Sequence, residues 1–292
     1  MSQPRFAMAL HGGAGARRDR DYTREIAHMR GLVEAGRDRL RAGASALDVA
    51  TDTVVVLEAS GLYVAGRGAS PNTAGDYELD ASLMDGSDAR AGAVAALNGY
   101  RSPILAARAV MERTPHVMLA GEGAAAFAAR AGREPGGGPA AWFTRAGKGE
   151  SNHPPGGLAH GTVGCVVRDG EGRLAAATST GGVFGKLPGR VGDTPLIGAA
   201  TWADTRVAVS CTGQGEYFIR AATAAQVAYR MRWAGEDVAA ATQAALAEVR
   251  ALGGEGGLIA IDVDGRIVAP FTSEGMKRAT LHPDGTIASD AF

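Results

Sequence analysis

A threonine that follows a glycine- and proline-rich stretch is the residue of this sequence best suited to nucleophilic chemistry. Thr162 lies in the run His160-Gly161-Thr162-Val163-Gly164. A threonine hydroxyl is a weak nucleophile unless a base removes its proton. If the chain were cut before Thr162, the new α-amino group, with a reference pKa of about 8, would be such a base. Taken alone, the dipeptide is more simply a turn that enters a strand.

Two further runs offer groups that could complete such a site. The run Ser-Thr-Gly-Gly at 179–182 follows the next predicted strand and supplies a second hydroxyl, that of Thr180. The run Cys-Thr-Gly-Gln-Gly-Glu at 211–216 ends a strand and begins a helix, so it supplies the hydroxyl of Thr212 and converging backbone N–H groups. An oxyanion hole needs such donors, although an ordinary strand-to-helix turn has the same pattern.

A cation and a carboxylate lie three residues apart in the glycine-rich loop 189–195. Arg190 and Asp193 could hold the carboxylate and the ammonium of an amino-acid-like ligand, with the guanidinium acting as a bidentate fork. A salt bridge between the two side chains that braces the loop explains the spacing equally well.

The elements that must position these groups follow from hydrophobic periodicity and from glycine turns. We expect strands at 6–10 (ending in a glycine turn at 11–15), 77–84, 90–97, 163–168, 173–178, 206–212, 258–263 and 267–271. We expect helices at 22–40, 46–59, 103–112, 122–131, 218–233 and 238–252. An Asp-Gly turn at 85–88 joins a hairpin, and Ser45 is a plausible helix start. Strands and helices in blocks predict an α+β fold with a mixed antiparallel sheet system.

The segment 132–161 is rich in glycine and proline and lacks an apolar period. It predicts a flexible linker of about thirty residues, which is uncommon inside a compact domain unless it is functional. Because the strands on either side need partners, we interpret residues 1–292 as one domain that this linker interrupts.

Composition excludes several classes of protein. The 292 residues are 46% hydrophobic and 21% charged, with 30 Lys plus Arg against 31 Asp plus Glu, so nothing favours nucleic acid as a partner. Cys165 and Cys211 are too few for a disulfide scaffold or a cysteine-only zinc site. Without a membrane-spanning run or a leader, we expect a cytoplasmic protein that contacts no membrane.

Several common motifs are also missing. The sequence has no dinucleotide-binding glycine fingerprint, no phosphate-binding loop and no Gly-x-Ser-x-Gly elbow. Its six histidines show no metal-ligand spacing.

Taken together, the ordered motifs are similar to those of the isoaspartyl peptidase/L-asparaginase family, the plant-type asparaginases among the N-terminal-nucleophile hydrolases. The runs that carry this resemblance are HGGAG (11–15), ELDASLMDG (78–86), AGAVAAL (91–97), SPILAARAVMERTPHVMLAGEGA (102–124), HGTVG (160–164), ATSTGG (177–182), GRVGDTPLIGA (189–199), CTGQGEYFIR (211–220) and GGLIAID (256–262). They cover nearly the whole chain outside the linker.

The resemblance implies a four-layer αββα sandwich that is made as an inactive precursor. Cleavage between Gly161 and Thr162 would give an α part, 1–161, and a β part, 162–292. Two such units usually pair, which makes an (αβ)2 heterotetramer. No cofactor for catalysis is implied.

The resemblance also assigns the catalytic roles. Thr162 would be the nucleophile and, through its freed amine, the base. Thr180 would tune this hydroxyl and assist self-cleavage. The Thr212 hydroxyl and the Gly213 N–H would hold the oxyanion.

Substrate binding follows in the same way. Arg190 would grip the substrate α-carboxylate, whereas Asp193 and the Gly215 carbonyl would hold the α-ammonium, beside Gly213. The substrates implied are β-aspartyl (isoaspartyl) dipeptides and L-asparagine, from which water releases L-aspartate.

A structural sodium, held by backbone carbonyls, is a further property that the resemblance implies. The corresponding positions here are Leu57, Glu58, Ser60, Tyr63, Ala65 and Arg67. Two positions depart from the family pattern, because Val64 and Thr272 each stand where asparagine is usual. Val64 puts the metal loop in question.

Two other functions stay open at this point. A glycosylasparaginase shares the fold, but it typically has His-Asp-Thr at the junction where this chain has His160-Gly161-Thr162. An uncleaved, non-catalytic homologue could still bind an aspartate-like ligand through Arg190 and Asp193. Cleavage before Thr162 distinguishes the enzyme from the binding protein.

Overall fold

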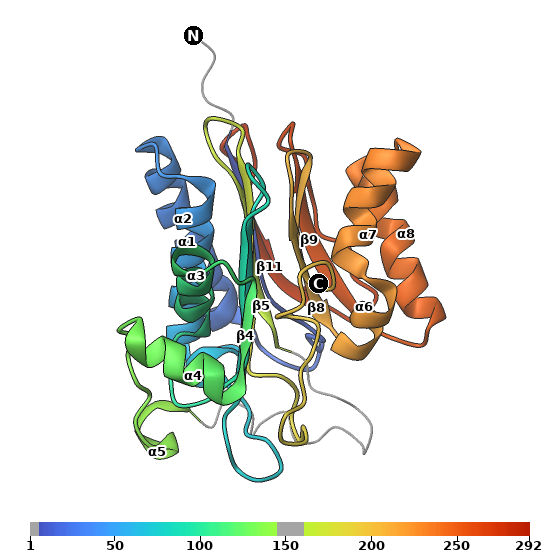
Figure 1. Ribbon diagram of the computed structural model, residues 1–292. Helices are drawn as coiled ribbons and strands as arrows, with labels where there is room; N and C mark the ends of the chain where they lie inside the picture. The colour runs from blue at the N-terminus through green and yellow to red at the C-terminus, as the bar shows by residue number, and fades with distance from the viewer. Residues whose placement is uncertain (1–5, 145–160) are drawn as a thin grey trace.

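Two β-sheets that face each other form the centre of the computed structural model, which describes residues 6–144 and 161–292 (Figure 1). Among these residues the larger sheet contains, in spatial order, β12 (Ile287–Asp290), β11 (Met276–Leu281), β1 (Ala7–Ala14), β5 (Val163–Arg168), β6 (Leu174–Thr180), β2 (Leu79–Asp85), β3 (Ala91–Leu97) and β4 (Met118–Ala120). The smaller sheet contains β10 (Ile267–Val268), β9 (Gly256–Asp262), β8 (Val207–Gly213) and β7 (Thr201–Ala203). Neighbouring strands are antiparallel, apart from β3 and β4. The predicted α+β class is confirmed.

Helices lie along the outer side of each sheet (Figure 1). The larger sheet is flanked by α1 (Thr23–Arg41), α2 (Ala46–Ser60) and α3 (Pro103–Arg113), with α4 (Gly121–Arg130) and the single turn α5 (Pro139–Trp142) below them. The smaller sheet is flanked by α6 (Gly215–Ala221), α7 (Thr223–Tyr229) and α8 (Val238–Ala251). In the part of the chain that the structure describes, no helix is both long and apolar enough to cross a membrane.

Buried apolar side chains fill each interface between these elements. Leu57 and Leu83 belong to the cluster between the first helices and the larger sheet. Ala9 and Ile259 belong to the cluster between the two sheets, and Phe218 to the cluster between the smaller sheet and its helices. Both faces of the central strands are therefore buried, including the polar residues that interrupt β2 and β8.

Helix α2 begins and ends where the sequence predicts. The Ser45 side chain accepts a hydrogen bond of 3.1 Å from the Asp48 N–H, which caps the first turn. Gly61, in the left-handed region at φ 71°, ends the helix. The end of α2 therefore lies at a fixed place beside strand β6, which it contacts.

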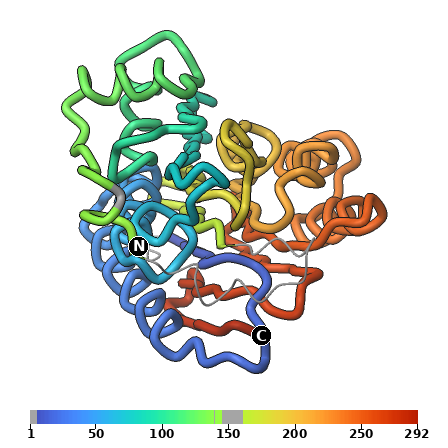
Figure 2. Tube along the Cα trace, turned by 90° about the horizontal axis from the view of Figure 1, so that it is seen from below, coloured from blue at the N-terminus to red at the C-terminus, as the bar shows by residue number. Residues whose placement is uncertain are grey.

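The first strand is longer than predicted, and the glycine turn expected at 11–15 is wrong. Strand β1 continues through His11 to Ala14, because it pairs with β5 on one side and with β11 on the other. The glycines produce a shift of register between His11 and Ala14 instead of a turn. Figure 2 shows this N-terminal strand beside the C-terminal strands.

The helix predicted over 218–233 is interrupted. Ala222 adopts a left-handed conformation, φ 46°, and separates α6 from α7. A π-helical turn, η3 (Arg230–Ala234), then follows α7. The hydrophobic period crosses this break without change, which is why the sequence pattern shows one helix.

The predicted linker, 132–161, is only partly described. Its first part contains α5 and a bridge between Tyr100 and Pro135, so it is ordered against the body of the protein. Residues 145–160 lie outside the described part of the chain. Gly161 is placed again, directly before β5.

Candidate active site

The two threonines singled out in the sequence face each other on adjacent strands. Thr162 immediately precedes β5, and Thr180 is the last residue of β6, the neighbouring strand. Thr162 Oγ1 donates a hydrogen bond of 3.2 Å to Thr180 Oγ1, which also accepts one of 3.0 Å from the Gly182 N–H. Both side chains are buried. The Thr180 oxygen is therefore fixed by the backbone and lies beside the Thr162 hydroxyl.

Gly161 is packed where no larger residue fits. A Cβ at this position would overlap the Val64 side chain, and one on Gly13 would come within 2.7 Å of the Gly161 Cα. Val64 also accepts a hydrogen bond of 2.7 Å from the Gly181 N–H, next to Thr180. Thus Val64, where the family usually has asparagine, connects the loop after α2 to both threonines through its backbone and packing.

Thr212 and Gly213 end β8 of the smaller sheet, and only Gly213 of the two lines the pocket around Thr162. The Ala14 N–H donates to Thr212 Oγ1 at 3.2 Å, so the hydroxyl proton of Thr212 is available for a second acceptor. Gly213 lines the same pocket as Thr162.

This narrow pocket, with a volume of about 10 Å³, brings together most of the residues predicted for the site. Its lining residues are Gly161, Thr162, Thr180, Gly182, Val183, Arg190, Asp193 and Gly213. Gly215, the first residue of α6, lies at its edge, because a Cβ there would be 2.6 Å from Asp193 Oδ1 and 3.3 Å from the Arg190 guanidinium.

Arg190 forms its ion pair with Glu216 rather than with Asp193. Its Nε and Nη2 lie 2.9 Å and 2.7 Å from Glu216 Oε1. The interpretation of Arg190 and Asp193 as a mutual brace is therefore not supported by the geometry. The arginine side chain is 16% exposed and still faces the pocket.

Two buried carboxyl groups lie in the field of this arginine. Burial raises the pKa of Asp193 to about 7 and that of Asp80 to about 6, although the positive charge of Arg190 opposes both shifts. In each carboxyl group Oδ2 is buried without a hydrogen-bond partner among the described residues. The Thr194 hydroxyl oxygen is likewise buried without a hydrogen-bond partner among the described residues. Unpartnered buried acceptors of this kind suit a ligand that brings its own N–H groups.

A chain of hydrogen bonds starts at the backbone of the nucleophile candidate and runs between the two sheets. His11 Nδ1 donates to the Thr162 carbonyl at 3.0 Å, and His11 Nε2 lies 2.9 Å from Ser210 Oγ. Burial lowers the pKa of His11 to about 3, so the ring is neutral. Its Nδ1 then carries the proton, and Ser210 donates to Nε2.

The chain continues through hydroxyl groups alone. Ser210 Oγ and Thr178 Oγ1 are 2.8 Å apart, and Thr201 Oγ1 lies 2.6 Å from Thr178 Oγ1. Ser82 Oγ then lies 2.7 Å from Thr201 Oγ1 and 2.6 Å from the carbonyl of Thr194, the residue after Asp193. We call the set His11, Ser210, Thr178, Thr201 and Ser82 the inter-sheet relay. It joins the backbone of Thr162 to the loop that carries Asp193.

Sequence reasoning gave no role to the relay, to Asp80 or to the Glu58 side chain. The signal that could have shown them is a polar residue inside an otherwise apolar strand or helix. Asp80 and Ser82 interrupt β2 in this way, as Ser210 interrupts β8. Such a residue must find a buried partner, although the sequence does not say which one.

The loop proposed to hold sodium is tightly wound, and four of its six proposed carbonyl ligands, those of Leu57, Tyr63, Ala65 and Arg67, already accept hydrogen bonds within the protein. A Cβ on Gly66 would lie 2.6 Å from the Glu58 carbonyl oxygen, and one on Gly68 would overlap that of Tyr63. Carbonyl oxygens are ligands that suit a hard cation such as sodium, and those of Glu58 and Ser60 complete the proposed set. Among the described residues no group of three His, Cys, Asp or Glu side chains could hold a metal.

Comparison with known proteins gives the same family as the motifs. The asparaginase family matches residues 4–137 and 140–288. The isoaspartyl peptidase of Salmonella typhimurium is 47% identical over 93% of this chain and 94% of its own length, and that of Escherichia coli is 46% identical over 93% and 91%. The human isoaspartyl peptidase/L-asparaginase is 38% identical over 97% and 98%. The chain belongs to the asparaginase family.

Proposed function

We propose that this protein is a self-processing threonine hydrolase that cleaves β-aspartyl dipeptides and L-asparagine and releases L-aspartate. The observation that carries the proposal is the single pocket in which Thr162 and Thr180 meet Arg190, Asp193 and Gly213. The names of the full-length relatives, isoaspartyl peptidase and isoaspartyl peptidase/L-asparaginase, support the substrate class.

In this proposal the chain is one N-terminal-nucleophile domain with four αββα layers, cut between Gly161 and Thr162. The Thr162 hydroxyl attacks the Gly161 carbonyl carbon, and water then hydrolyses the resulting ester. The close packing of Gly161 against Gly13 and Val64 supports this step, because it fixes the peptide bond next to the hydroxyl. Thr180, at 3.2 Å, is the neighbour that can share the hydroxyl proton.

After cleavage, the freed amine of Thr162 takes the proton from its own hydroxyl. Oγ1 attacks the side-chain carbonyl of the aspartyl unit, and the departing amine leaves an ester on the threonine. The Thr212 hydroxyl and the Gly213 N–H stabilise the negative charge on the carbonyl oxygen. Water then releases aspartate and restores the threonine.

The α-substituents of the substrate bind at the other end of the pocket. Arg190 receives the carboxylate by a bidentate pair of hydrogen bonds, so its guanidinium turns from Glu216 toward the ligand. The ammonium binds Asp193 and the Gly215 carbonyl, with the negative charge of Asp80 close behind. This assignment gives a role to buried carboxyl groups in each of which one oxygen has no hydrogen-bond partner among the described residues.

The proposal includes three further properties. Sodium binds the carbonyls of the loop after α2 and stiffens it, without taking part in the reaction. Two processed units form an (αβ)2 assembly. The protein works in the cytoplasm, in keeping with two buried, free cysteines, Cys165 and Cys211.

The test is hydrolysis of β-aspartyl-leucine by the purified protein and by the Thr162→Ala and Thr162→Ser variants. We expect turnover by the wild type, slower turnover by Thr162→Ser and none by Thr162→Ala. Turnover by Thr162→Ala at the wild-type rate would overturn the mechanism. If neither the wild type nor a variant hydrolyses the dipeptide, hydrolysis of an asparagine-linked sugar tests the glycosylasparaginase alternative. If neither substrate is hydrolysed, the result favours the uncleaved, non-catalytic binding protein.

A further inference from the structure

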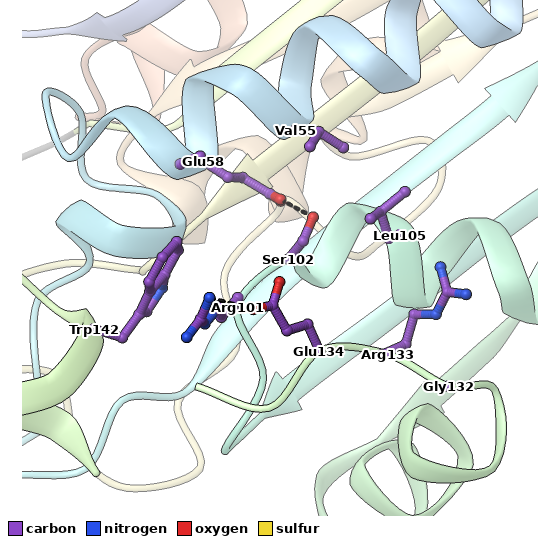
Figure 3. A pocket seen from close by; sticks show the side chains of 10 residues that line it. Val55, Glu58, Arg101, Ser102, Leu105, Gly132, Arg133, Glu134 and Trp142 are labelled. Atoms are coloured by element: carbon purple, nitrogen blue, oxygen red, sulfur yellow. Dashed lines mark hydrogen bonds and ion pairs between the residues drawn. The ribbon is translucent and has the colours of Figure 1, made fainter. Parts of the chain in front are cut away.

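A second cavity, separate from the active site, lies between α2, the start of α3 and the turn α5 (Figure 3). Its volume is about 270 Å³, which suits a molecule of the size of an amino acid. The residues that line it are Val55, Glu58, Ala59, Arg101, Ser102, Leu105, Gly132, Arg133, Glu134 and Trp142. None of these residues lines the pocket around Thr162.

Two N–H donors in the wall of this cavity have no acceptor in the part of the chain that the structure describes. Arg101 Nε and Trp142 Nε1 are both buried, and among the described residues neither has a hydrogen-bond partner. The two groups belong together, since the Arg101 guanidinium lies 4.6 Å from the centroid of the Trp142 ring. Buried N–H groups without partners are rare in proteins and call for an explanation.

The other residues of the cavity wall indicate what kind of molecule would accept hydrogen bonds from these two donors. Val55 and Leu105 form an apolar side, whereas Arg101 and its ion-pair partner Glu134 lie on the opposite side (Figure 3). The Arg101 side chain is 36% exposed and that of Glu134 is 68% exposed, so the charged side opens to solvent.

We propose that this cavity binds a small aliphatic carboxylate. The carboxylate accepts hydrogen bonds from Arg101 Nε and Trp142 Nε1, and the aliphatic body covers Val55 and Leu105. A carboxylate is the acceptor of choice, because a guanidinium and an indole N–H can share its two oxygens and the guanidinium contributes charge.

One residue of the cavity wall, Glu58, is hydrogen-bonded to the strand that carries Thr180. The Glu58 carboxylate accepts hydrogen bonds from Ser102 Oγ, from the Ile104 N–H at 3.1 Å and from Ser179 Oγ at 2.6 Å. Ser179 precedes Thr180 in β6. The ligand would therefore contact the side chain that ties the start of α3 to the strand of the active site.

The experiment is isothermal titration calorimetry on the purified protein, which needs no turnover and so does not depend on the proposed function. The probes are L-leucine, 4-methylpentanoate, which lacks the ammonium, and L-leucinamide, which lacks the carboxylate. We expect saturable binding of at least one carboxylate and none of leucinamide. Binding of both carboxylates indicates a general aliphatic acid, and binding of leucine alone indicates an amino acid.

Variants test whether the carboxylate binds in this cavity. Arg101→Met is expected to weaken it about tenfold or more, and Trp142→Phe, which keeps the ring, several-fold. Arg232→Met, an exposed arginine beyond α7, is the matched control and should bind like the wild type. The thermal midpoint of each variant shows that it is folded.

Three results would overturn the proposal. The first is no binding of either carboxylate, and the second is equal binding of leucinamide. The third is binding that survives in Arg101→Met and Trp142→Phe but is lost in Asp193→Asn, because leucine would then occupy the active site.

Discussion

Two polar regions meet at Thr162, and they differ in how their buried groups are satisfied. Every member of the inter-sheet relay, from His11 to Ser82, has hydrogen-bond partners within the protein. In the region around Arg190, Asp80 of β2 and the loop residues Asp193 and Thr194 each keep a buried oxygen without a partner among the described residues. A network that is satisfied internally stabilises the fold and positions its neighbours, whereas unpartnered groups weaken the fold and are ready for a ligand.

Buried polar atoms without hydrogen-bond partners also mark the second cavity, the one lined by Arg101 and Trp142. Of the buried side-chain atoms without partners among the described residues, those of Arg101 and Trp142 are donors and those of Asp80 and Asp193 are acceptors. The two sites are therefore expected to take complementary parts of small molecules, a carboxylate in one and an ammonium in the other.

The largest effect is expected for Asp193→Asn. Loss of the charge-assisted hydrogen bond to the substrate ammonium should lower kcat/KM about 100-fold. Because the pKa of Asp193 is raised to about 7, folding favours the protonated carboxyl, and stability falls as pH rises from about 4 to 7. The amide removes this cost, so the thermal midpoint at pH 8 should equal or exceed that of the wild type. Steady-state kinetics and thermal unfolding measure both, with Asp284→Asn, an exposed carboxyl, as the control.

Asp80→Asn is expected to have a smaller effect, about tenfold on kcat/KM, because Asp80 acts on the ammonium through its charge rather than by direct contact. The loss should appear in KM more than in kcat. A variant that lowers kcat alone would show that Asp80 does not belong to the binding region.

A substitution in the inter-sheet relay is expected to lower stability more than activity. Ser210→Ala leaves His11 Nε2 without its donor and removes a partner of Thr178, so it should lower the free energy of unfolding by about 1–3 kcal/mol. The effect on kcat should be only a few-fold, because no relay side chain contacts the substrate. Denaturant unfolding, with Ser289→Ala on the edge strand β12 as the control, measures this. If Ser210→Ala were as stable as the wild type, the relay would not stabilise the fold, and the contrast drawn between the two regions would be wrong.

The dependence of kcat/KM on pH should separate the ionisation of Asp193 from that of the Thr162 amine. As pH rises from 6 to 8, Asp193 ionises with a pKa of about 7 and gains its ammonium partner, while the Thr162 amine, with a reference pKa of about 8, loses its proton. Both changes raise kcat/KM, so the logarithmic slope should exceed 1 at the acid end. The slope should not exceed 1 in Asp193→Asn.

The sequence identified the residues that meet in the pocket around Thr162 better than the contacts that connect them. Thr162 precedes a strand and Thr180 ends one, whereas Arg190 and Asp193 lie in a glycine-rich loop, and local pattern is enough to find all three runs. The hairpin of β2 and β3 and the helix after Ser45 were predicted for the same reason, since turn and cap are local.

Long-range partners could not be predicted in this way. His11 and Ser210 are separated by 199 residues, and Glu58 and Ser179 by 121. Each side chain shows in the sequence only as a polar residue in an apolar run. The break at Ala222 has no signal either, because alanine favours the helix that the tertiary structure interrupts. The strands β11 and β12 depend on pairing with β1, at the other end of the chain.

The intact mass of the purified protein after one day at neutral pH tests the central claim most directly. We predict two pieces of about 16 kDa and about 13 kDa, in proportion to chain length from 29.7 kDa, with the smaller piece beginning at Thr162. One uncut chain that persists on longer incubation would contradict the account, because the amine of Thr162 would never form.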